Sequence, residues 1–277
     1  MTKNIVYVLL ALTAFAGNSI LCRYGLHGNL IDPASFTLIR LASGAFTLLI
    51  IILISQQGIS KPERRHWLGA SYLFLYAATF SFAYISLDTA TGALILFGTV
   101  QITMIGFSLL KGQRLSKHEW AGLLIACLGF LLLTLPHLTA PSWQGLALML
   151  VSGIGWALYT LNGKGSTRPL MDTTLNFILA TPVALLLLFL NETHSLSTAG
   201  VITAIASGAL ASGLGYAIWY AVLPHITTTQ AASSQLFVPV IAAIGGLLFL
   251  AEPLTLVLVL ASLLILGGIY LVIKQST

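Results

Sequence analysis

Ten apolar runs follow one another along the chain, with short polar segments between them. Each is close to the ~20 residues with which an α-helix crosses the hydrocarbon core of a bilayer. Apolar residues are continuous within the runs and do not alternate with polar ones, which argues against a transmembrane β-barrel. The pattern therefore predicts an all-α polytopic membrane protein of ten transmembrane helices. The predicted helices span residues 4–24, 34–55, 67–87, 89–110, 119–136, 143–163, 173–190, 199–223, 227–250 and 254–273.

Composition excludes the main alternatives to a membrane protein. Of 277 residues, 57% are hydrophobic and 7% are charged, and the mean hydropathy is +0.97. Soluble domains carry about 25% charged residues, because charge covers their surface. A soluble enzyme of this size is therefore excluded, and so is a disordered chain, which needs low hydrophobicity.

The basic residues give the orientation of the predicted helices. Ten of the twelve Lys and Arg residues fall on one side when the loops are numbered alternately, and cytoplasmic loops are the ones that collect Lys and Arg. Both termini are thus predicted to face the cytoplasm, in a multi-pass protein of the plasma (inner) membrane. The acids Asp32, Asp88, Glu192 and Glu252 lie on the other side. The ten basic residues are Lys3, Lys61, Arg64, Arg65, Lys111, Arg114, Lys117, Lys164, Arg168 and Lys274.

The two halves of the chain resemble each other at a shift of 139 residues. Residues 89–135 align without a gap on 228–274, with ten of 47 pairs identical. Each half has five predicted helices, and because five is odd the second half must be inverted in the membrane. Residues 1–136 and 137–277 are the two predicted repeats. Inverted repeats are the architecture of many secondary transporters, since two such halves can exchange conformations around a central site.

Along its whole length, the chain resembles the ten-span EamA-type branch of the drug/metabolite transporter superfamily. The closest functional resemblance is to the YddG-type amino acid exporters. The resemblance implies a cavity lined by the first, third, fourth, sixth, eighth and ninth helices, with the fifth and tenth set aside. It rests on Phe237-Val238-Pro239 through Gly245-Gly246, Leu250-Ala251-Glu252-Pro253-Leu254-Thr255, Gly267-Gly268, and Asp32-Pro33 followed by Arg40.

Aromatic and amide side chains are the candidates for binding cargo. The third helix carries aromatics at four-residue spacing, which places them on one face. They either line a cavity or belong to the aromatic belt at the membrane interface, and Tyr72, Tyr84 and Tyr220 suit the belt. The amides either bond other helices or contact cargo. The predicted substrate-binding residues are Asn18, Tyr76, Phe80, Gln101, Trp156, Tyr159, Tyr216, Trp219 and Gln235.

Arg40 lies well inside the second predicted helix, roughly 10 Å from its start at 1.5 Å per residue. Its side chain either extends outward to Asp32 or Asp88, or serves as a gate pair or as an anchor for a cargo carboxylate. Arg40 and Asp88 are therefore the candidate gate or charge pair.

The predicted function is secondary transport of small amphipathic metabolites by alternating access, with amino acids, aromatic or otherwise apolar, as exported cargo. Because no acid or histidine lies at mid-span, a facilitator or exchanger is expected in place of a proton-driven pump. Efflux of cationic amphiphilic drugs or amines is the alternative cargo. The expected partners are a small-molecule substrate, the lipid bilayer and a second copy of the chain, joined through the last helices of each repeat; no nucleic acid is expected.

A channel or a membrane-embedded enzyme is the alternative of another class. A channel needs a charged ring or a carbonyl filter, which the predicted helices lack. His118-Glu119 begins like the zinc motif H-E-x-x-H, but Gly122 occupies the position of the second histidine. The sequence therefore predicts no enzyme, no cofactor and no metal.

Overall fold

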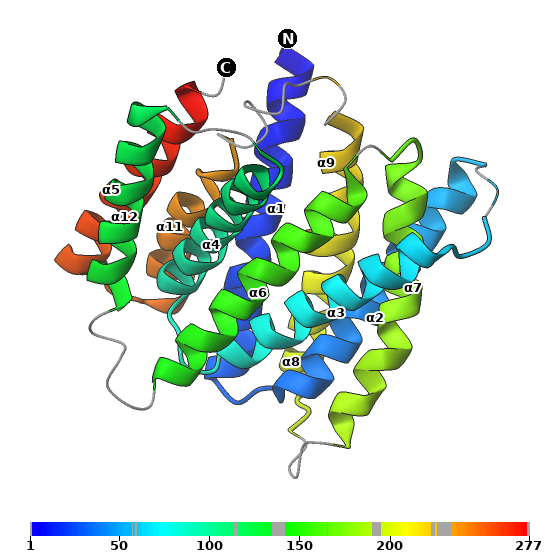
Figure 1. Cartoon of the computed structure of the whole chain (residues 1–277). Coiled ribbons are helices and arrows are strands. Elements are labelled where there is room, and N and C mark those ends of the chain that lie inside the picture. The colour runs from blue at the N-terminus through cyan, green and yellow to red at the C-terminus, as the bar shows by residue number, and fades with distance from the viewer. Residues whose placement is uncertain are drawn as a thin grey trace.

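The computed structural model describes residues 2–56, 58, 60–112, 116–134, 142–164, 166–189, 195–222, 225 and 234–275. Within these residues the regular secondary structure is helical, apart from one isolated bridge between Ile31 and Leu196 (Figure 1). Ten helical rods result, as predicted, if α8, η2 and α9 are taken as one. The elements are α1 (Thr2–His27), α2 (Pro33–Ile54), α3 (Arg64–Ala83), α4 (Thr89–Leu110), α5 (Lys117–Thr134), α6 (Ser142–Gly163), α7 (Pro169–Leu188), α8 (Thr198–Ala206), η2 (Ser207–Leu214), α9 (Gly215–Val222), α11 (Val238–Leu250) and α12 (Leu256–Gln275).

Local sequence explains several helix ends. The carboxylate of Asp32 accepts a hydrogen bond from the Ser35 backbone N–H at 2.9 Å, and Pro33 opens α2 with the φ angle that a first turn requires. Ser197 caps α8 in the same way. Ala251 ends α11 in the left-handed conformation, with φ of 54°. This turn sets the position of Glu252.

Six of the described helices are long and apolar enough to cross a membrane by length and composition. They are Asn4–His27, Pro33–Ile54, Thr89–Leu110, Trp143–Gly163, Pro169–Leu188 and Thr198–Val222. Val238–Leu250 and Leu256–Val272 are shorter apolar helices. The predicted ninth helix, 227–250, overlaps α11, which covers Val238–Leu250. Pro239 lies in the first turn of α11, where its missing N–H costs no helix hydrogen bond.

The first helix of each half packs mainly against the other half. Helix α1 contacts α8, η2, α9 and α11, while α6 contacts α3 and α4. In the same way, α2 lies against η2 and α7, and α3 lies against α7. Corresponding helices thus make corresponding contacts, which is what two related halves of opposite orientation require. The arrangement places the centre of the protein between the halves.

Helices α5 and α12, the last of each half, lie together at one side of the protein (Figure 1). Gly122 and Gly268 allow this close approach. A Cβ added to Gly122 would lie 2.6 Å from the Gly268 carbonyl oxygen, and one added to Gly268 would lie 2.5 Å from the Gly122 carbonyl oxygen. These small-residue faces are occupied within one chain, so the predicted dimer through the same helices would use their remaining faces; it stays a prediction.

The eighth rod departs from regular α-helix in its middle. Residues Ser207–Leu214 form a π-helical segment between α8 and α9. Residues five apart share a face there, because the backbone hydrogen bonds join residues five positions apart. Ser207 and Ser212 therefore point to the same side, and both are buried. Ala204, Gly208, Ser212 and Tyr216, spaced four residues apart along this rod, are also buried.

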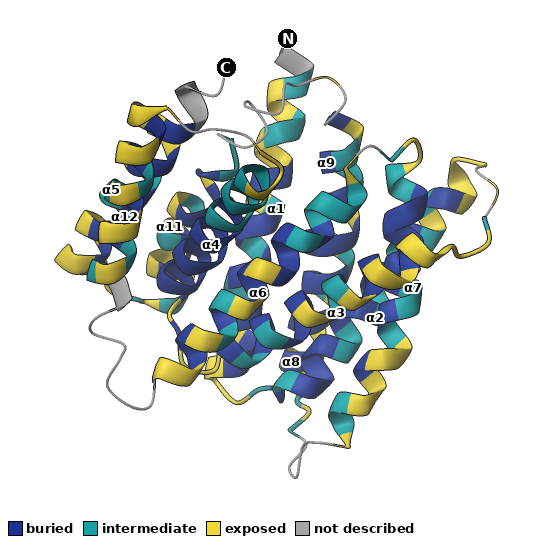
Figure 2. Ribbon diagram, in the orientation of Figure 1, coloured by how far each residue is buried: buried dark blue, intermediate teal, exposed yellow. Residues whose placement is uncertain are grey.

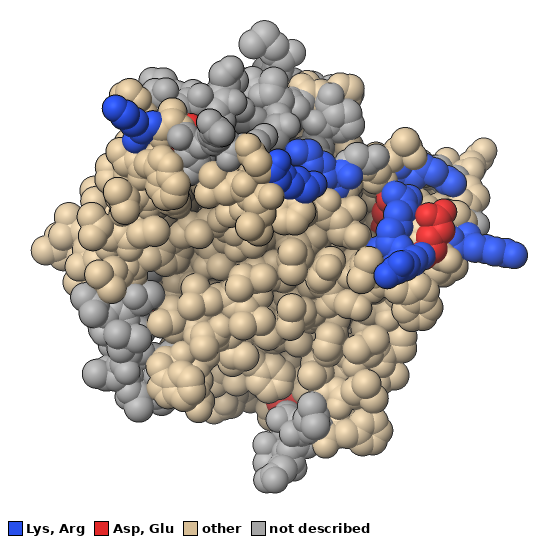
Figure 3. Space-filling view, in the orientation of Figure 1, with Lys and Arg blue, Asp and Glu red and all other residues tan. Residues whose placement is uncertain are grey.

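Apolar and charged side chains are distributed as a bilayer demands. Leu124, Leu128 and Leu263 are among the exposed large apolar residues, and Figure 2 shows exposed positions along α5 and α12. On the face shown in Figure 3, Lys and Arg gather toward the end at which Figure 1 draws both termini, and a broad surface made almost entirely of uncharged residues lies below them. The end that carries the termini is called the inner end below, and the opposite one the outer end.

Candidate functional site

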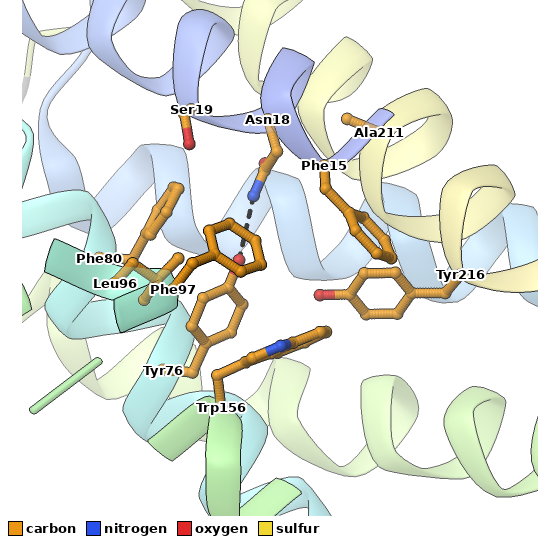
Figure 4. Close-up of a pocket in the computed structure, with 10 residues that line it drawn as sticks. All are labelled: Phe15, Asn18, Ser19, Tyr76, Phe80, Leu96, Phe97, Trp156, Ala211 and Tyr216. Atoms are coloured by element: carbon orange, nitrogen blue, oxygen red, sulfur yellow. Dashed lines mark hydrogen bonds between the residues drawn. The ribbon is translucent and has the colours of Figure 1, made fainter. Parts of the chain in front are cut away.

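A small cavity lies at the centre of the protein, where five rods meet. Its free volume is about 10 Å³, about the space that one water molecule needs. The rings around it fill most of the space between the halves (Figure 4), so cargo can enter only after these side chains or helices move. The lining residues are Phe15, Asn18, Ser19, Tyr76, Phe80, Leu96, Phe97, Trp156, Ala211 and Tyr216.

Aromatic rings from both halves form one continuous cluster around this cavity. Trp156 is its centre: its ring centroid lies 4.9 Å from that of Tyr76 and 5.2 Å from that of Tyr216. Phe15 packs edge-on against Trp156 and Tyr216, at 6.3 and 5.7 Å. Aromatic contacts of this kind stabilise by about 0.5–1.5 kcal/mol each beyond the burial of area. The cluster therefore holds the two halves together at the centre.

Polar side chains line one side of the same cavity. The Asn18 amide nitrogen donates to the Tyr76 hydroxyl at 3.1 Å (Figure 4). The amide oxygen of Asn18 accepts a hydrogen bond from the Ser207 hydroxyl in the π-helical segment. All three residues are buried, and a buried amide in a membrane protein needs such partners. Asn18 thus joins a helix of the first half to one of the second.

Arg40 lies directly behind the Tyr76 and Phe80 rings. Its guanidinium donates to the Tyr76 hydroxyl at 2.9 Å and to the Ser212 hydroxyl at 3.3 Å. The guanidinium carbon lies 5.1 Å from the Tyr76 ring centroid and 4.9 Å from that of Phe80, within the range of cation–π attraction. The residue is 1% exposed.

The predicted extension of Arg40 outward to Asp32 or Asp88 is wrong. Asp88 is bound by Arg23, and the Asp32 carboxylate caps α2. Arg40 finds its hydrogen-bond partners at mid-membrane, on α3 and in the π-helical segment.

A second buried arginine closes the outer end. The Arg23 guanidinium, on α1, lies 3.1 Å from a carboxylate oxygen of Asp88 and 3.1 Å from one of Glu252. It also donates to the carbonyl oxygens of Tyr84 and Ile85. The other Glu252 oxygen accepts from the Thr89 backbone N–H at 2.8 Å. This outer cluster joins α1 and α4 of the first half to the α11–α12 turn of the second.

Asp172, on α7, forms the corresponding inner cluster. One of its carboxylate oxygens lies 2.9 Å from an Arg65 guanidinium nitrogen and 3.0 Å from His66 Nε2. The other accepts from the Ser166 hydroxyl. Because His66 Nδ1 accepts from the Glu63 backbone N–H at 2.8 Å, its Nε2 carries the proton and donates to Asp172. The inner cluster joins α3 of the first half to α7 of the second.

Comparison with known proteins identifies the architecture. The model of the EamA-like transporter family matches residues 2–135 and again residues 143–274. The chain belongs to the EamA-like transporter family. It is therefore a transporter and not an enzyme, and it is a multi-pass protein of the cytoplasmic membrane, where EamA transporters reside. The repeat boundary at 136/137 lies outside the described residues and stays a prediction.

The similarity of this EamA transporter to its relatives extends over nearly the whole chain. An uncharacterized protein of Pseudomonas aeruginosa is 48% identical, over 98% of this chain and 94% of its own length. An Escherichia coli protein named "Probable amino-acid metabolite efflux pump" is 26% identical, over 97% of this chain and 94% of its own. A solved crystal structure with 20% identity superposes with a TM-score of 0.69 over 97% of each chain, which shows the fold.

The EamA fold brings five of the nine nominated residues to the cavity: Asn18, Tyr76, Phe80, Trp156 and Tyr216. Two more belong to the surrounding aromatic cluster. Tyr159 packs on Trp156 at 5.5 Å, and Trp219 packs on Phe15 at 5.8 Å.

The other two nominated residues lie away from the lining of the EamA cavity. Gln101 is buried on α4, about one turn beyond Leu96 and Phe97. Gln235 is half-buried, ahead of the first residue of α11.

The structure also shows site residues that sequence reasoning missed. Phe15 and Phe97 lie on helices whose apolar faces look alike in sequence, and nothing there marks one face as central. Tyr84, assigned to the interfacial belt, is fully buried and packs on Phe80 at 4.7 Å. Its place in the four-residue spacing of Tyr76 and Phe80 is the signal that could have found it.

Proposed function

We propose that this EamA transporter moves small amphipathic metabolites, chiefly amino acids with aromatic or other apolar side chains, and exports them from the cytoplasm. The main support for the proposal is the central cavity, which is lined by aromatic rings, by the Asn18 amide and by the hydroxyl groups of Ser19, Tyr76 and Tyr216. Tyr and Trp combine apolar bulk with a polar tip, which suits a cargo with one apolar and one polar end. The name of the E. coli relative, a probable amino-acid metabolite efflux pump, supports amino acids as cargo.

Two charged clusters support transport by alternating access. Each one joins a helix of the first half to a helix of the second, the outer cluster through Arg23 and the inner one through Asp172. Both are formed while the central cavity is almost filled. Breaking one cluster at a time would open the cavity to one side of the membrane and keep the other side closed.

A growth and uptake screen tests the cargo. Cells that produce the protein are challenged with inhibitory amino acids, amines and dyes, and the positive compounds are then followed in proteoliposomes. We expect faster efflux of apolar amino acids than in cells with the empty vector. Resistance confined to amines and dyes would overturn the amino acid proposal and favour the cationic alternative, for which Tyr76, Trp156 and Tyr216 supply an aromatic surface.

Replacing Trp156 by phenylalanine is expected to change the preference among aromatic amino acids. The smaller ring leaves space beside Tyr76 and Tyr216, and filling or emptying such space changes selectivity by about tenfold. Competition between tryptophan and phenylalanine in proteoliposomes measures the change. Trp120→Phe, at a half-exposed position on α5, is the matched control. Unchanged preference in Trp156→Phe and in a Tyr216→Leu variant would place the cargo elsewhere.

Transport is expected to proceed without obligatory proton movement. Among the residues that the structure describes, the cavity lining contains no carboxylate and no histidine, the groups with which membrane transporters usually carry protons. Proteoliposomes with an enclosed pH dye should show cargo movement without a matching pH change. Strict coupling of acidification to cargo would contradict this expectation, and Asp172→Asn would then test the buried His66–Asp172 pair as the proton site.

A further inference from the structure

Among the residues that the structure describes, Arg40 is a buried cation that forms no ion pair with a carboxylate. Asp88 and Glu252 pair with Arg23, Asp172 pairs with Arg65 and His66, and Asp32 caps α2. A charge removed from water without a counter-ion costs several kcal/mol. The rings of Tyr76 and Phe80 and two hydroxyl groups offset only part of that cost.

The guanidinium also keeps donors in reserve. Its Nη1 nitrogen has no hydrogen-bond partner in the described part of the chain, although it is fully buried. Five N–H groups in a fixed fork are what a carboxylate binds in bidentate fashion. An unused Nη at a buried arginine is therefore an incomplete anion site.

The Tyr76 hydroxyl is a second donor beside it. Its oxygen accepts hydrogen bonds from the Asn18 amide at 3.1 Å and from Arg40 at 2.9 Å. Two donors on the oxygen leave the hydroxyl proton to be donated, and no described residue is recorded as accepting it. Tyr76 lines the cavity, so its hydroxyl connects the guanidinium to the space where cargo would lie.

We propose that Arg40 and Tyr76 together bind the carboxylate of the cargo, with Arg40 as the charged anchor. This assignment rests on the proposed transport of amphipathic metabolites and narrows their class to compounds with a carboxylate beside an apolar group. A carboxylate would supply the counter-ion that Arg40 lacks and the acceptor that the Tyr76 proton lacks. The aromatic cluster around Trp156 would receive the apolar end.

The same charge argues against cationic cargo. An ammonium group in the cavity would lie near the fixed positive charge of Arg40, with no described carboxylate in the lining to compensate it. The aromatic rings alone favour a cation by about 0.5–2 kcal/mol. Repulsion in a low-dielectric interior is larger than that, even with an effective dielectric constant near 20.

Three compounds that share one aromatic ring test the anchor. Phenylalanine carries both charged groups, 3-phenylpropionate only the carboxylate, and phenethylamine only the amine. Their competition for transport is measured in proteoliposomes of wild type, Arg40→Gln and Arg40→Lys. We expect Arg40→Gln to weaken the binding of phenylalanine and 3-phenylpropionate by about 10- to 100-fold, the contribution of a charge-assisted hydrogen-bonded pair. The binding of phenethylamine should be unchanged or stronger. Arg40→Lys should recover part of the loss, since it keeps the charge without the fork.

Equal loss for all three compounds in Arg40→Gln would overturn the anchor and leave transport of amino acids standing. If phenylalanine is not transported but 3-phenylpropionate is, and depends on Arg40, the amino acid proposal fails and the anchor stands. If the Arg40 variants do not fold, Tyr76→Phe provides a second test, because it removes one hydrogen-bond donor. It should weaken the binding of both carboxylate compounds by about tenfold. Thermal stabilisation of purified wild type by the two carboxylates, but not by phenethylamine, is the variant-free measurement; the reverse order contradicts the anchor.

Discussion

Replacing Arg23 by glutamine is expected to lower the free energy of unfolding by about 3–5 kcal/mol, the cost of removing one partner from a buried ion pair. The Glu252 carboxylate, whose side chain is 12% exposed, would lose its charged partner and keep only the Thr89 backbone N–H. The carbonyl oxygens of Tyr84 and Ile85 would lose their donor as well. Thermal unfolding in detergent and unfolding in mixed micelles measure the loss.

The outer cluster offers its own controls. The Asp88 side chain is 51% exposed, so Asp88→Asn should cost only about 0–1 kcal/mol. The double variant Arg23→Gln with Glu252→Gln leaves no buried carboxylate unpaired in the outer cluster, since only the half-exposed Asp88 stays charged, and it should be more stable than Arg23→Gln alone. Transport should fall most in Arg23→Gln, because the outer end no longer closes. If Arg23→Gln is as stable as the wild type, or if Asp88→Asn loses as much stability as Arg23→Gln, the outer cluster does not hold this end closed.

The number and orientation of the helices could be predicted because they depend on hydrophobicity and charge, which can be read from the sequence residue by residue. Apolar length alone defines a span, and the segregation of Lys and Arg defines its direction. The family resemblance followed from local runs such as Glu252-Pro253-Leu254. Partners of single charges could not be predicted in this way. Arg23 and Asp88 are 65 positions apart, and only the packing of α1 against α4 and α11 brings their side chains together.

The candidate site could be predicted in part, for a related reason. Tyr76 and Phe80 share a face by regular spacing, and the structure puts that face at the cavity. Ser207 lies in the π-helical segment, 189 positions from Asn18, and only the packing of this segment against α1 brings the two side chains together. Gln101 follows Phe97 by four residues and shares its helix face, but it lies about one turn beyond the cavity. The sequence does not define how far along a helix the cavity extends.

Gly208→Ala is expected to have the other large effect, because Gly208 lies where the π-helical segment crosses α2. A Cβ at this position would overlap the Ser43 hydroxyl and the Arg40 carbonyl oxygen, closer than van der Waals contact allows. The carbonyl belongs to the backbone, so no side-chain rotation relieves the overlap, and the two rods must separate. Overpacking of this kind costs about 1–3 kcal/mol, occasionally more, and here we expect the upper end of that range, measured by thermal unfolding in detergent.

The substitution should also reduce transport more than its effect on stability explains. Moving the Arg40 backbone shifts the guanidinium away from Ser212 and Tyr76, whose hydroxyl groups hold it. Gly17→Ala is the control: it lies on α1 beside Asn18, a Cβ there meets nothing within 4 Å, and alanine favours a helix by up to about 1 kcal/mol over glycine. Gly17→Ala should therefore be neutral or stabilising and keep full transport. Removing the Ser43 hydroxyl in Gly208→Ala with Ser43→Ala should restore part of the stability. Full stability and transport in Gly208→Ala alone would contradict the tight crossing, and with it the position that the crossing gives to Arg40.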